Sequence, residues 1–222
     1  MIDPARSFDR AADAYERTRP DYPDALLELV PVPADATVLD LGAGTGKLTR
    51  VLAPRYRQVI AVEPLDGMRA ILETVVPEVE SRAGQAEAIP LADASVDAVF
   101  AAQAFHWFAN EAAVAEIARV LRPGGVLALV WNDGDDGRPD PLPEDYRAYL
   151  AELRAIAEFD QAPLWQDVLD RRGLLDNARS VSWIARRGEA EQSSILERLG
   201  ELLPDGIYAV PNRANVLWTL RV

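Results

Sequence analysis

The chain has 222 residues, of which 49% are hydrophobic and 27% charged, so its size and composition indicate one ordinary globular domain. It contains no cysteine and a single histidine, His106, which excludes disulfide scaffolds, Cys-ligated zinc, iron–sulfur clusters, Cys nucleophiles and multi-histidine zinc sites. A net charge of −13 argues against nucleic acid as a partner, because phosphate binding requires a basic face.

The segment that begins at Met1 has neither a basic stretch nor an apolar core of the kind found in secretory signals. No apolar run approaches the ~18 residues that suggest a membrane-spanning helix. We therefore expect a cytoplasmic protein that has no membrane partner. Its oligomeric state stays open.

Residues 1–25 precede the first predicted strand and carry Tyr15, Arg19 and Tyr22. Short apolar segments then alternate with helical patterns, and they lack the polar–apolar alternation of a half-exposed strand. Such segments suit parallel strands buried on both faces of a sheet. The predicted strands are Thr37–Leu41, Gln58–Val62, Val79–Arg82, Val96–Ala101 and Val126–Val130.

The clearest helical pattern precedes the fifth predicted strand, where Val114, Ile117, Ala118 and Leu121 follow helical spacing. Arg122-Pro123-Gly124-Gly125 should end this helix, because Pro cannot continue a helix and Gly turns freely. Repeated strand–helix units predict an open, doubly wound α/β sheet.

The C-terminal part has a different pattern. Asn132–Pro143 is rich in Asp, Gly and Pro and is predicted as a solvated loop; its aspartates do not fit the spacing of a calcium-binding EF-hand, and no metal site is expected. Helices are predicted from Tyr146 to Ala157 and around Ser193–Leu203. Arg179–Arg187 and Ala214–Val222 are predicted strands, and such a final pair suits an antiparallel sheet edge.

A glycine-rich loop follows the first predicted strand in Val38-Leu39-Asp40-Leu41-Gly42-Ala43-Gly44-Thr45-Gly46. Glycine permits positive φ and lets the backbone approach a ligand closely. A nucleotide-triphosphate loop is disfavoured, because Leu41 stands where its first Gly belongs and Leu48 where a hydroxyl should bind Mg²⁺. The third glycine also comes one residue too early for a dinucleotide fingerprint, and Lys47 stands in its place. The spacing suits an aminocarboxylate ligand, while a tight turn without a ligand remains an alternative.

Glu63 ends the second predicted strand, in Val59-Ile60-Ala61-Val62-Glu63. In doubly wound sheets, an acid at this place accepts hydrogen bonds from ribose hydroxyls. A solvated glutamate is the alternative interpretation. Ligands of such sheets lie outside the carboxyl ends of the strands. There Pro64, Leu65 and Met68 offer an apolar plate for a base, and Gln85 with the Ala86 amide could read its polar edge.

Four motifs in order resemble class I S-adenosylmethionine (SAM)-dependent methyltransferases of the type 11 group, which includes trans-aconitate and ubiquinone/menaquinone-type enzymes. They are VLDLGAGTGKLT from Val38, VIAVEP from Val59, GQAEAIPLADASVDAVFAAQAFHWF from Gly84 and ARVLRPGGVLALVWND from Ala118. FDRAADAYERTRPDYP from Phe8 matches as well. The resemblance covers about residues 8–133.

The resemblance implies a Rossmann-like sheet of seven strands, mostly parallel, with an antiparallel last strand and helices on both faces. It implies one domain over residues 1–222: an N-terminal lid over 1–25, a cofactor-binding half over 26–133, and a half over 134–222 that contributes to the acceptor pocket. After Arg187 the chain is shorter than the family pattern, which leaves the acceptor pocket least defined.

The resemblance also implies a set of contacts to SAM, the cofactor, whose product is S-adenosylhomocysteine. The glycine loop would wrap the methionine part, Glu63 would hold the ribose, Gln103 would lie near the amino group, and the N-terminal residues would close over the cofactor. The implied cofactor-binding residues are Tyr15, Arg19, Tyr22, Asp40, Gly42, Ala43, Gly44, Thr45, Gly46, Glu63, Pro64, Met68, Gln85, Ala86 and Gln103.

On the acceptor side, His106 follows the fourth predicted strand. It is a candidate catalytic base, an acceptor-positioning donor, or a residue of the pocket wall packed on Trp107. Trp107 and Trp131 either line the acceptor pocket or belong to the core. Arg19 either pairs with a carboxylate or is solvated, and Lys47 is expected to be a solvated residue of the first helical turn.

The function predicted from these features is methyl transfer from SAM to a small-molecule acceptor by in-line displacement. Two alternatives remain: a non-catalytic SAM-binding module and, less favoured by the loop spacing, a nicotinamide-dependent oxidoreductase.

Overall fold

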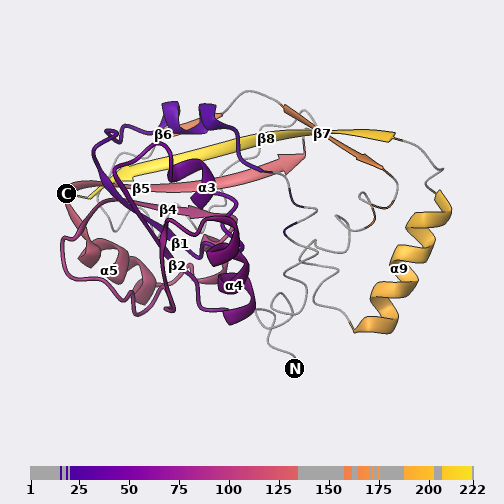
Figure 1. Ribbon diagram of the computed structural model, residues 1–222, viewed down its shortest axis with the longest axis horizontal. Helices are drawn as coiled ribbons and strands as arrows, with labels where there is room; N and C mark the ends of the chain where they lie inside the picture. The colour runs from indigo at the N-terminus through magenta and orange to yellow at the C-terminus, as the bar shows by residue number, and fades with distance from the viewer. Residues whose placement is uncertain are drawn as a thin grey trace.

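The protein is described by a computed structural model (Figure 1). It describes residues 16, 19, 21–134, 158–161, 165–170, 172, 175, 188–202 and 207–221. Elements up to residue 134 are the 3₁₀-helix η1 (Asp24–Leu29), β1 (Thr37–Leu41), α3 (Thr49–Leu52), β2 (Gln58–Val62), α4 (Asp66–Val75), β3 (Glu80–Arg82), β4 (Val96–Ala102), the 3₁₀-helix η2 (Phe105–Trp107), α5 (Glu111–Val120) and β5 (Leu121–Gly134). After it come β6 (Glu158–Gln161), β7 (Trp165–Asp170), α9 (Glu189–Leu202) and β8 (Ile207–Leu220).

The central sheet contains five parallel strands in the order β3-β2-β1-β4-β5. This confirms the predicted parallel sheet. The chain moves outward from β1 to β3, then returns to the other side of β1 with β4. Such a reversal opens a crevice at the carboxyl ends of β1 and β4, which is where ligands of open α/β sheets bind.

Beyond β5 the sheet continues with β8, which pairs antiparallel from Val126–Leu220 to Gly134–Asn212. Both β6 and β7 also pair antiparallel with β8, so the structure joins eight strands in this sheet. β5 and β8 extend together past the shorter parallel strands (Figure 1). Helix α9 lies at the far end of this long pair, away from the parallel strands.

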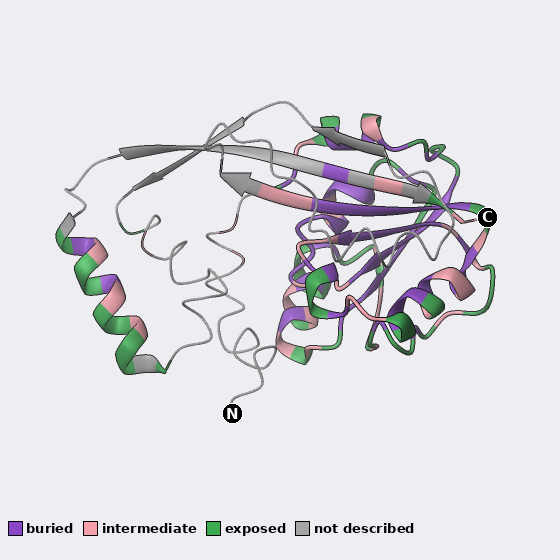
Figure 2. Cartoon of the chain, turned by 180° about the vertical axis from the view of Figure 1, so that it is seen from behind, coloured by how far each residue is buried: buried purple, intermediate pink, exposed green. Residues whose placement is uncertain are grey.

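Two apolar cores lie on opposite faces of the sheet, because successive residues of a strand point to opposite sides. On β1, Val38 belongs to the core under η1 and α3, while Leu39 belongs to the core under α5. β1 is buried along its whole length, and β2 and β4 are buried along most of theirs, whereas β3 at the sheet edge is partly exposed (Figure 2). Helices on both faces, as predicted, therefore cover a sheet with no solvated side in its centre.

Helix α5 begins where Asn110 caps it: the Asn110 side chain accepts a hydrogen bond from the Ala113 backbone N–H at 3.0 Å. It ends at Val120, before Pro123, as predicted. β5 nevertheless begins at Leu121, earlier than expected, because Leu121 pairs with Val96 while Val126 pairs with Ala98. The turn residues between them form a bulge, in which Gly124 takes φ +75°.

Some predictions for the C-terminal part change or lie outside the described residues. Asn132–Gly134 belong to β5 instead of a loop, since they pair with β8. The predicted helix around Ser193–Leu203 corresponds to α9, and the strand predicted from Ala214 lies in β8. The rest of the Asn132–Pro143 loop, the helix from Tyr146 to Ala157 and the Arg179–Arg187 strand lie outside. No helix in the described ranges has the length and apolarity needed to cross a bilayer.

Candidate functional site

The predicted glycine loop leaves β1 at its carboxyl end and is tied to β2 through backbone hydrogen bonds. The N–H groups of Gly42 and Ala43 both donate to the Val62 carbonyl, at 2.8 and 3.1 Å. Gly42, Gly44 and Gly46 take φ values of +70°, +57° and +88°. This left-handed backbone is the conformation that glycine adopts without strain, so the three glycines are explained by the path of the loop.

The three glycines face different surroundings. A Cβ on Gly42 would lie 2.8 Å from the Ala104 Cβ, and one on Gly46 would lie 3.2 Å from the Leu72 Cγ. A Cβ on Gly44 would meet nothing within 4 Å. Gly42 and Gly46 are thus required by close packing, whereas Gly44 borders open space in which a ligand can approach the backbone.

Glu63 follows β2 and is bonded to this loop. Its side chain is buried, with the residue 5% exposed. Oε2 accepts a hydrogen bond from the Gly44 N–H at 2.8 Å, and Oε1 accepts one from the Leu65 N–H at 2.9 Å. Each carboxylate oxygen has further lone pairs. The structure therefore brings the predicted ribose-binding acid and the glycine loop together in one site.

Asp40 lies beneath the loop in β1 and is 1% exposed. The Thr49 hydroxyl donates to its Oδ2 at 2.6 Å. The pKa of Asp40 is raised to about 7, chiefly by burial; the Thr49 hydrogen bond opposes this shift, and the nearby Glu63 carboxylate adds to it. Asp40 thus supports the loop from inside the fold and titrates near neutral pH.

Thr45 supplies an observation that bears on ligand binding. The residue is 1% exposed, and its Oγ1 has no hydrogen-bond partner within the part of the chain that the structure describes. Buried hydroxyls are normally paired. An unpaired hydroxyl in the loop, beside the open space at Gly44, fits a ligand with polar groups such as the aminocarboxylate of SAM.

The N-terminal segment contacts the glycine loop region through Asp21, which is bonded to Lys47 directly after the loop. Lys47 Nζ donates to the Asp21 carboxylate at 2.9 Å, and Lys47 is 8% exposed. The expectation of a solvated lysine was therefore wrong, because Asp21 provides a counter-ion. Arg50 forms ion pairs with Glu16 and Asp21. These contacts join the N-terminal segment to the turn after the glycine loop.

The predicted lid residues occupy different environments. Tyr22 is 9% exposed and packs in the core with Leu26 and Leu27. Arg19 is half-buried. Tyr15 lies outside the described residues. Tyr22 hence contributes apolar packing to the core.

The candidate base-binding residues are split between buried and exposed positions. Met68 and Ala86 are buried, while Pro64 and Gln85 are exposed. Gln85 forms an isolated antiparallel bridge with Ala88, which shapes the turn after β3. Pro64 follows β2, Met68 lies in the first turn of α4, and Gln85 and Ala86 follow β3.

Gln103, just after β4, has φ +51°, an uncommon backbone conformation for a residue with a side chain. Its N–H donates to the Val130 carbonyl at 2.9 Å, and its Nε2 donates to the Asn132 carbonyl at 2.7 Å. The strained backbone is thus held by both the main chain and the side chain. The Asn132 side chain in turn donates to the Asp21 carbonyl at 3.3 Å.

The acceptor-side candidates lie in and near η2. His106 and Trp107 are exposed, Trp107 by 39%, and their rings lie 4.9 Å apart in a tilted contact. Phe105, between them and β4, is 1% exposed and anchors the turn in the core. Trp131 is half-buried against the core under α5. Trp107 is therefore a surface residue and Trp131 partly a core residue.

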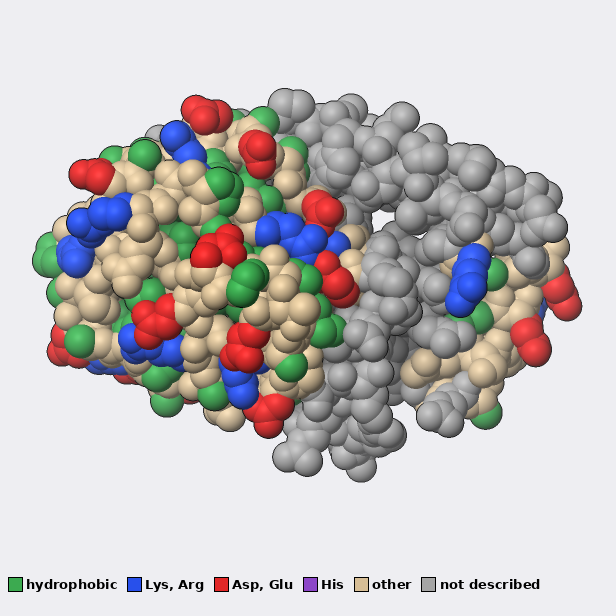
Figure 3. Space-filling model, viewed as in Figure 1, with side chains coloured by type: hydrophobic (Ala, Val, Ile, Leu, Met, Phe, Trp, Pro, Cys, Tyr) green, Lys and Arg blue, Asp and Glu red, His purple; other side chains and the backbone are tan. Residues whose placement is uncertain are grey.

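Several residues that shape the site were not predicted: Asp21, Thr49 and Asn132. Asp21 and Thr49 act by pairing with Lys47 and Asp40, which lie far enough away that only the fold shows the pairing. Asn132 could have been found from its place two residues after the predicted strand Val126–Val130, although β5 itself continues through it. On the face in Figure 3, acidic and basic side chains alternate over the described surface. Among the described residues, no group of three or more His, Cys, Asp or Glu side chains forms a candidate metal site.

Comparison with known proteins places these motifs in a family. A profile described as "Methyltransferase domain" matches residues 39–129. An uncharacterized methyltransferase of Mycobacterium tuberculosis is 40% identical over 214 residues, covering 90% of this chain and 87% of the relative. Trans-aconitate 2-methyltransferase of Azoarcus sp. is 36% identical over 163 residues, covering 70% of this chain and 63% of the relative.

The fold also resembles that of solved structures. A geranyl diphosphate methyltransferase in complex with SAM matches with a TM-score of 0.55 and 17% identity, covering 96% of this chain and 85% of that one. At this identity the likeness concerns the fold alone.

Proposed function

Since the chain belongs to the methyltransferase family of these relatives and is a SAM-dependent methyltransferase, we propose that Glu63 and the glycine loop together hold SAM. The observation that carries this proposal is the bond between them: the Glu63 carboxylate accepts from the Gly44 N–H at 2.8 Å. A buried carboxylate held in this way is oriented before the ligand arrives. A carboxylate has several lone-pair sites and can also accept from the two hydroxyls of a ribose.

Each part of the crevice is assigned a part of the cofactor. Gly42, Ala43, Gly44, Thr45 and Gly46 hold the methionine part above Asp40, with the Thr45 hydroxyl as a donor. Pro64, Met68, Gln85 and Ala86 surround the base, and Gln103 lies near the amino group. Tyr15, Arg19 and Tyr22 belong to a lid over residues 1–25. The buried Asp40, Thr45 and Glu63 support this assignment.

Methyl transfer makes modest demands on the protein. SAM supplies an electrophilic methyl group on a sulfonium, whose sulfur leaves as a neutral thioether. The chain therefore needs to align the acceptor with that methyl and to exclude water. His106, in η2 after β4, is the proposed acceptor-positioning residue, or a base where the attacked atom carries a proton. Trp107 and Trp131 are proposed to lie beside the acceptor.

The proposed acceptor is a small molecule that carries a carboxylate. Two relatives are named for such acceptors: trans-aconitate 2-methyltransferase, and a malonyl-[acyl-carrier protein] O-methyltransferase that is 41% identical over 103 residues. A carboxylate is already charged at neutral pH, so its methylation requires no base. This suits a site whose one imidazole is exposed.

The remaining expectations stay proposals. An antiparallel strand at the end of the parallel sheet is supported by the pairing of β5 with β8, although eight strands are joined instead of the seven that the resemblance implies. The three-part division of the chain at residues 25 and 133, the cytoplasmic location and the lack of a nucleic-acid partner are predictions from sequence. The comparisons give no support to a nicotinamide-dependent oxidoreductase or a non-catalytic module.

Calorimetry with SAM and S-adenosylhomocysteine tests the site. Glu63→Ala should weaken binding by about 2–3 kcal/mol, because charge-assisted hydrogen bonds to the ribose are lost. Glu80→Ala is the matched control, since Glu80 is an exposed glutamate of the edge strand β3, paired with Ile60 before the carboxyl end of β2. Unchanged affinity in the Glu63 variant would remove the ribose assignment.

The acceptor is tested by a transfer assay with labelled SAM over carboxylic acids, phenols, quinols and amines. Carboxylic acids should accept the label as methyl esters, which are identified by mass and by alkaline hydrolysis. Label in amines or phenols alone would contradict the carboxylate proposal while leaving the donor site intact.

A further inference from the structure

The segment between β3 and β4 carries Gln85 and Ala86, the two residues proposed to read the base. It contains little regular structure. The Ala88 N–H donates to the Gln85 carbonyl at 3.1 Å, and a Cβ on Gly84 would lie 2.6 Å from the Pro90 Cδ. A loop with few backbone hydrogen bonds of its own needs side-chain contacts from other elements to keep one conformation.

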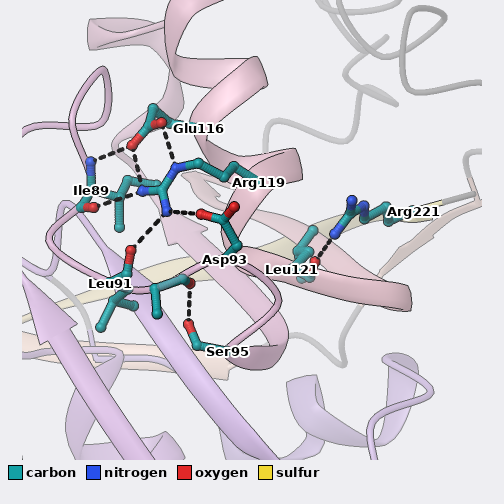
Figure 4. Close-up of polar contacts among 9 residues, drawn as sticks. Ile89, Leu91, Asp93, Ser95, Glu116, Arg119, Leu121 and Arg221 are labelled. Atoms are coloured by element: carbon teal, nitrogen blue, oxygen red, sulfur yellow. Dashed lines mark hydrogen bonds and ion pairs between the residues drawn. The ribbon is translucent and has the colours of Figure 1, made fainter.

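Arg119, on α5, is such an anchor (Figure 4). Its Nη2 donates to the Ile89 carbonyl at 2.9 Å, and its Nη1 donates to the Leu91 carbonyl and the Asp93 carboxylate, both at 2.8 Å. One guanidinium thus holds three positions of the loop. Its planar fork presents donors in fixed directions, which suits this task better than a flexible ammonium.

Glu116, one helical turn before Arg119, completes the arrangement. Arg119 donates to both Glu116 oxygens at 2.7 Å, and Glu116 Oε2 also accepts from the Ile89 N–H at 2.9 Å. The Arg119 hydrogen bonds hold the pKa of the Glu116 carboxyl below its usual value. Ile89 therefore has both its N–H and its carbonyl bonded to this pair of side chains.

The anchored segment is continuous with the base-reading residues. Ile89 and Ala86 are both buried in the core under α5, at 3% and 6% exposure. A second contact from the same helix lies between them: the Nδ2 of Asn110, the residue that caps α5, donates to the Glu87 carboxylate at 2.8 Å. The two ends of helix α5 therefore both hold this segment: Asn110 at the start of the helix binds it at Glu87, and Arg119 near the end of the helix binds it from Ile89 to Asp93.

We propose that Glu116 and Arg119 are positioning residues that fix the base-reading conformation of Gln85 and Ala86 and so determine selectivity for adenine in the donor. The inference rests on the proposed function, in which these two residues meet the base. Neither side chain is assigned a contact with the ligand; each acts through the loop backbone.

The probe pair is S-adenosylhomocysteine and S-inosylhomocysteine, which differ in the base alone. Hypoxanthine carries an N–H where adenine has an acceptor, so an ordered Ala86 N–H would be left unpaired against it. Dissociation constants for both compounds are measured by calorimetry for the unaltered chain and for Arg119→Gln, Glu116→Gln and Arg122→Gln.

Arg122→Gln is the matched control. Arg122 also pairs with a carboxylate, Asp97, and donates to a backbone carbonyl, that of Ser95, but neither partner lies in the stretch from Gln85 to Asp93. We expect the unaltered chain and the Arg122 variant to prefer S-adenosylhomocysteine at least tenfold. Arg119→Gln and Glu116→Gln should lose most of that preference, chiefly through weaker binding of the adenine compound.

The outcomes separate two failures. If the unaltered chain binds both compounds equally, the assignment of Gln85 and Ala86 to the base is wrong. If it discriminates and the Arg119 and Glu116 variants keep the same ratio, the positioning role alone is overturned. Should Arg119→Gln fail to fold, Glu116→Gln and Arg119→Lys decide in its place, since both retain part of the network; an unchanged ratio in both contradicts the proposal.

Discussion

The two sides of the proposed site are built differently. On the donor side, the glycine loop is bonded through its backbone to Val62 and Glu63, and Glu63 is 5% exposed. On the acceptor side, His106 and Trp107 are exposed on a short 3₁₀ turn, anchored by Phe105. The donor crevice is therefore pre-organised by burial and backbone bonds. The acceptor side depends on a few side chains, which suits one cofactor shared by a family with many acceptors.

The largest effect is expected from filling the donor loop. Gly42→Val should destabilise the fold by roughly 3 kcal/mol or more, because it adds a left-handed backbone penalty to a clash with Ala104. Gly44→Ala is the control: it shares the positive φ but has open space, so about 1 kcal/mol is expected. Denaturant unfolding of both variants without ligand measures the difference. Equal losses would show that close packing at Gly42 is unimportant.

The next effect concerns the buried acid of the donor side. Asp40 keeps its proton in the folded chain up to about pH 7, whereas an exposed aspartate ionises near 3.8. The folded state thus binds more protons than the unfolded state in that window, so stability falls as the pH rises through it. The change is about 1.4 kcal/mol for each pH unit. Asp97 and Glu116, whose pKa values are lowered, act in the opposite direction.

Asp40→Asn isolates this contribution, because Asn cannot ionise and still accepts from Thr49. Relative to the unaltered chain, the variant should gain stability steadily between about pH 4 and 7 and then level off. Unfolding free energies across this range measure the gap. Parallel profiles for the two proteins would mean that Asp40 ionises normally.

A smaller and more selective effect is expected on the acceptor side. His106→Ala should lower turnover about tenfold or more while leaving the SAM dissociation constant nearly unchanged, since His106 lies outside the donor crevice. His106→Asn separates the two roles: it should restore turnover if His106 positions the acceptor by a hydrogen bond, and not if it removes a proton. Full turnover in the Ala variant would mean that His106 is only a residue of the pocket wall.

The smallest effect is expected where the N-terminal segment meets the donor loop. Asp21→Asn removes the charge opposite Lys47, but the Asp21 side chain is 61% exposed. The expected loss is below about 1 kcal/mol and should shrink at high salt. A double-mutant cycle with Lys47→Met measures the coupling. A coupling of several kcal/mol would show that this ion pair is far less screened than its exposure indicates.

Much of the donor side was predictable from local sequence. The predicted strands Thr37–Leu41 and Gln58–Val62 coincide with β1 and β2, because buried parallel strands are short apolar segments ended by turn residues. The glycine loop was predictable for a similar local reason, because closely spaced glycines directly after a buried strand indicate a tight turn. The start of β5 did not: Pro123 and Gly124 signal a turn, and only pairing with β4 makes that turn a bulge.

The acceptor side and the supporting contacts were less predictable. Exposure of Trp107 and partial burial of Trp131 follow from which elements cover them. Lys47 was expected in solvent, yet it pairs with Asp21, a residue far back in the chain. The role of Arg119 was not predicted from the sequence, although this residue holds the loop that carries Gln85 and Ala86.

By itself, the amino-acid sequence determined the parallel strands, the glycine loop and the position of the acid Glu63, because short apolar segments and left-handed turns are local properties. Tertiary structure alone decided which distant groups meet: Gly44 with Glu63, Thr49 with Asp40, and Arg119 with Ile89. Burial sets the charge state of Asp40, and the position of the N-terminal segment gives Lys47 its partner Asp21. Both depend on how all the layers pack together.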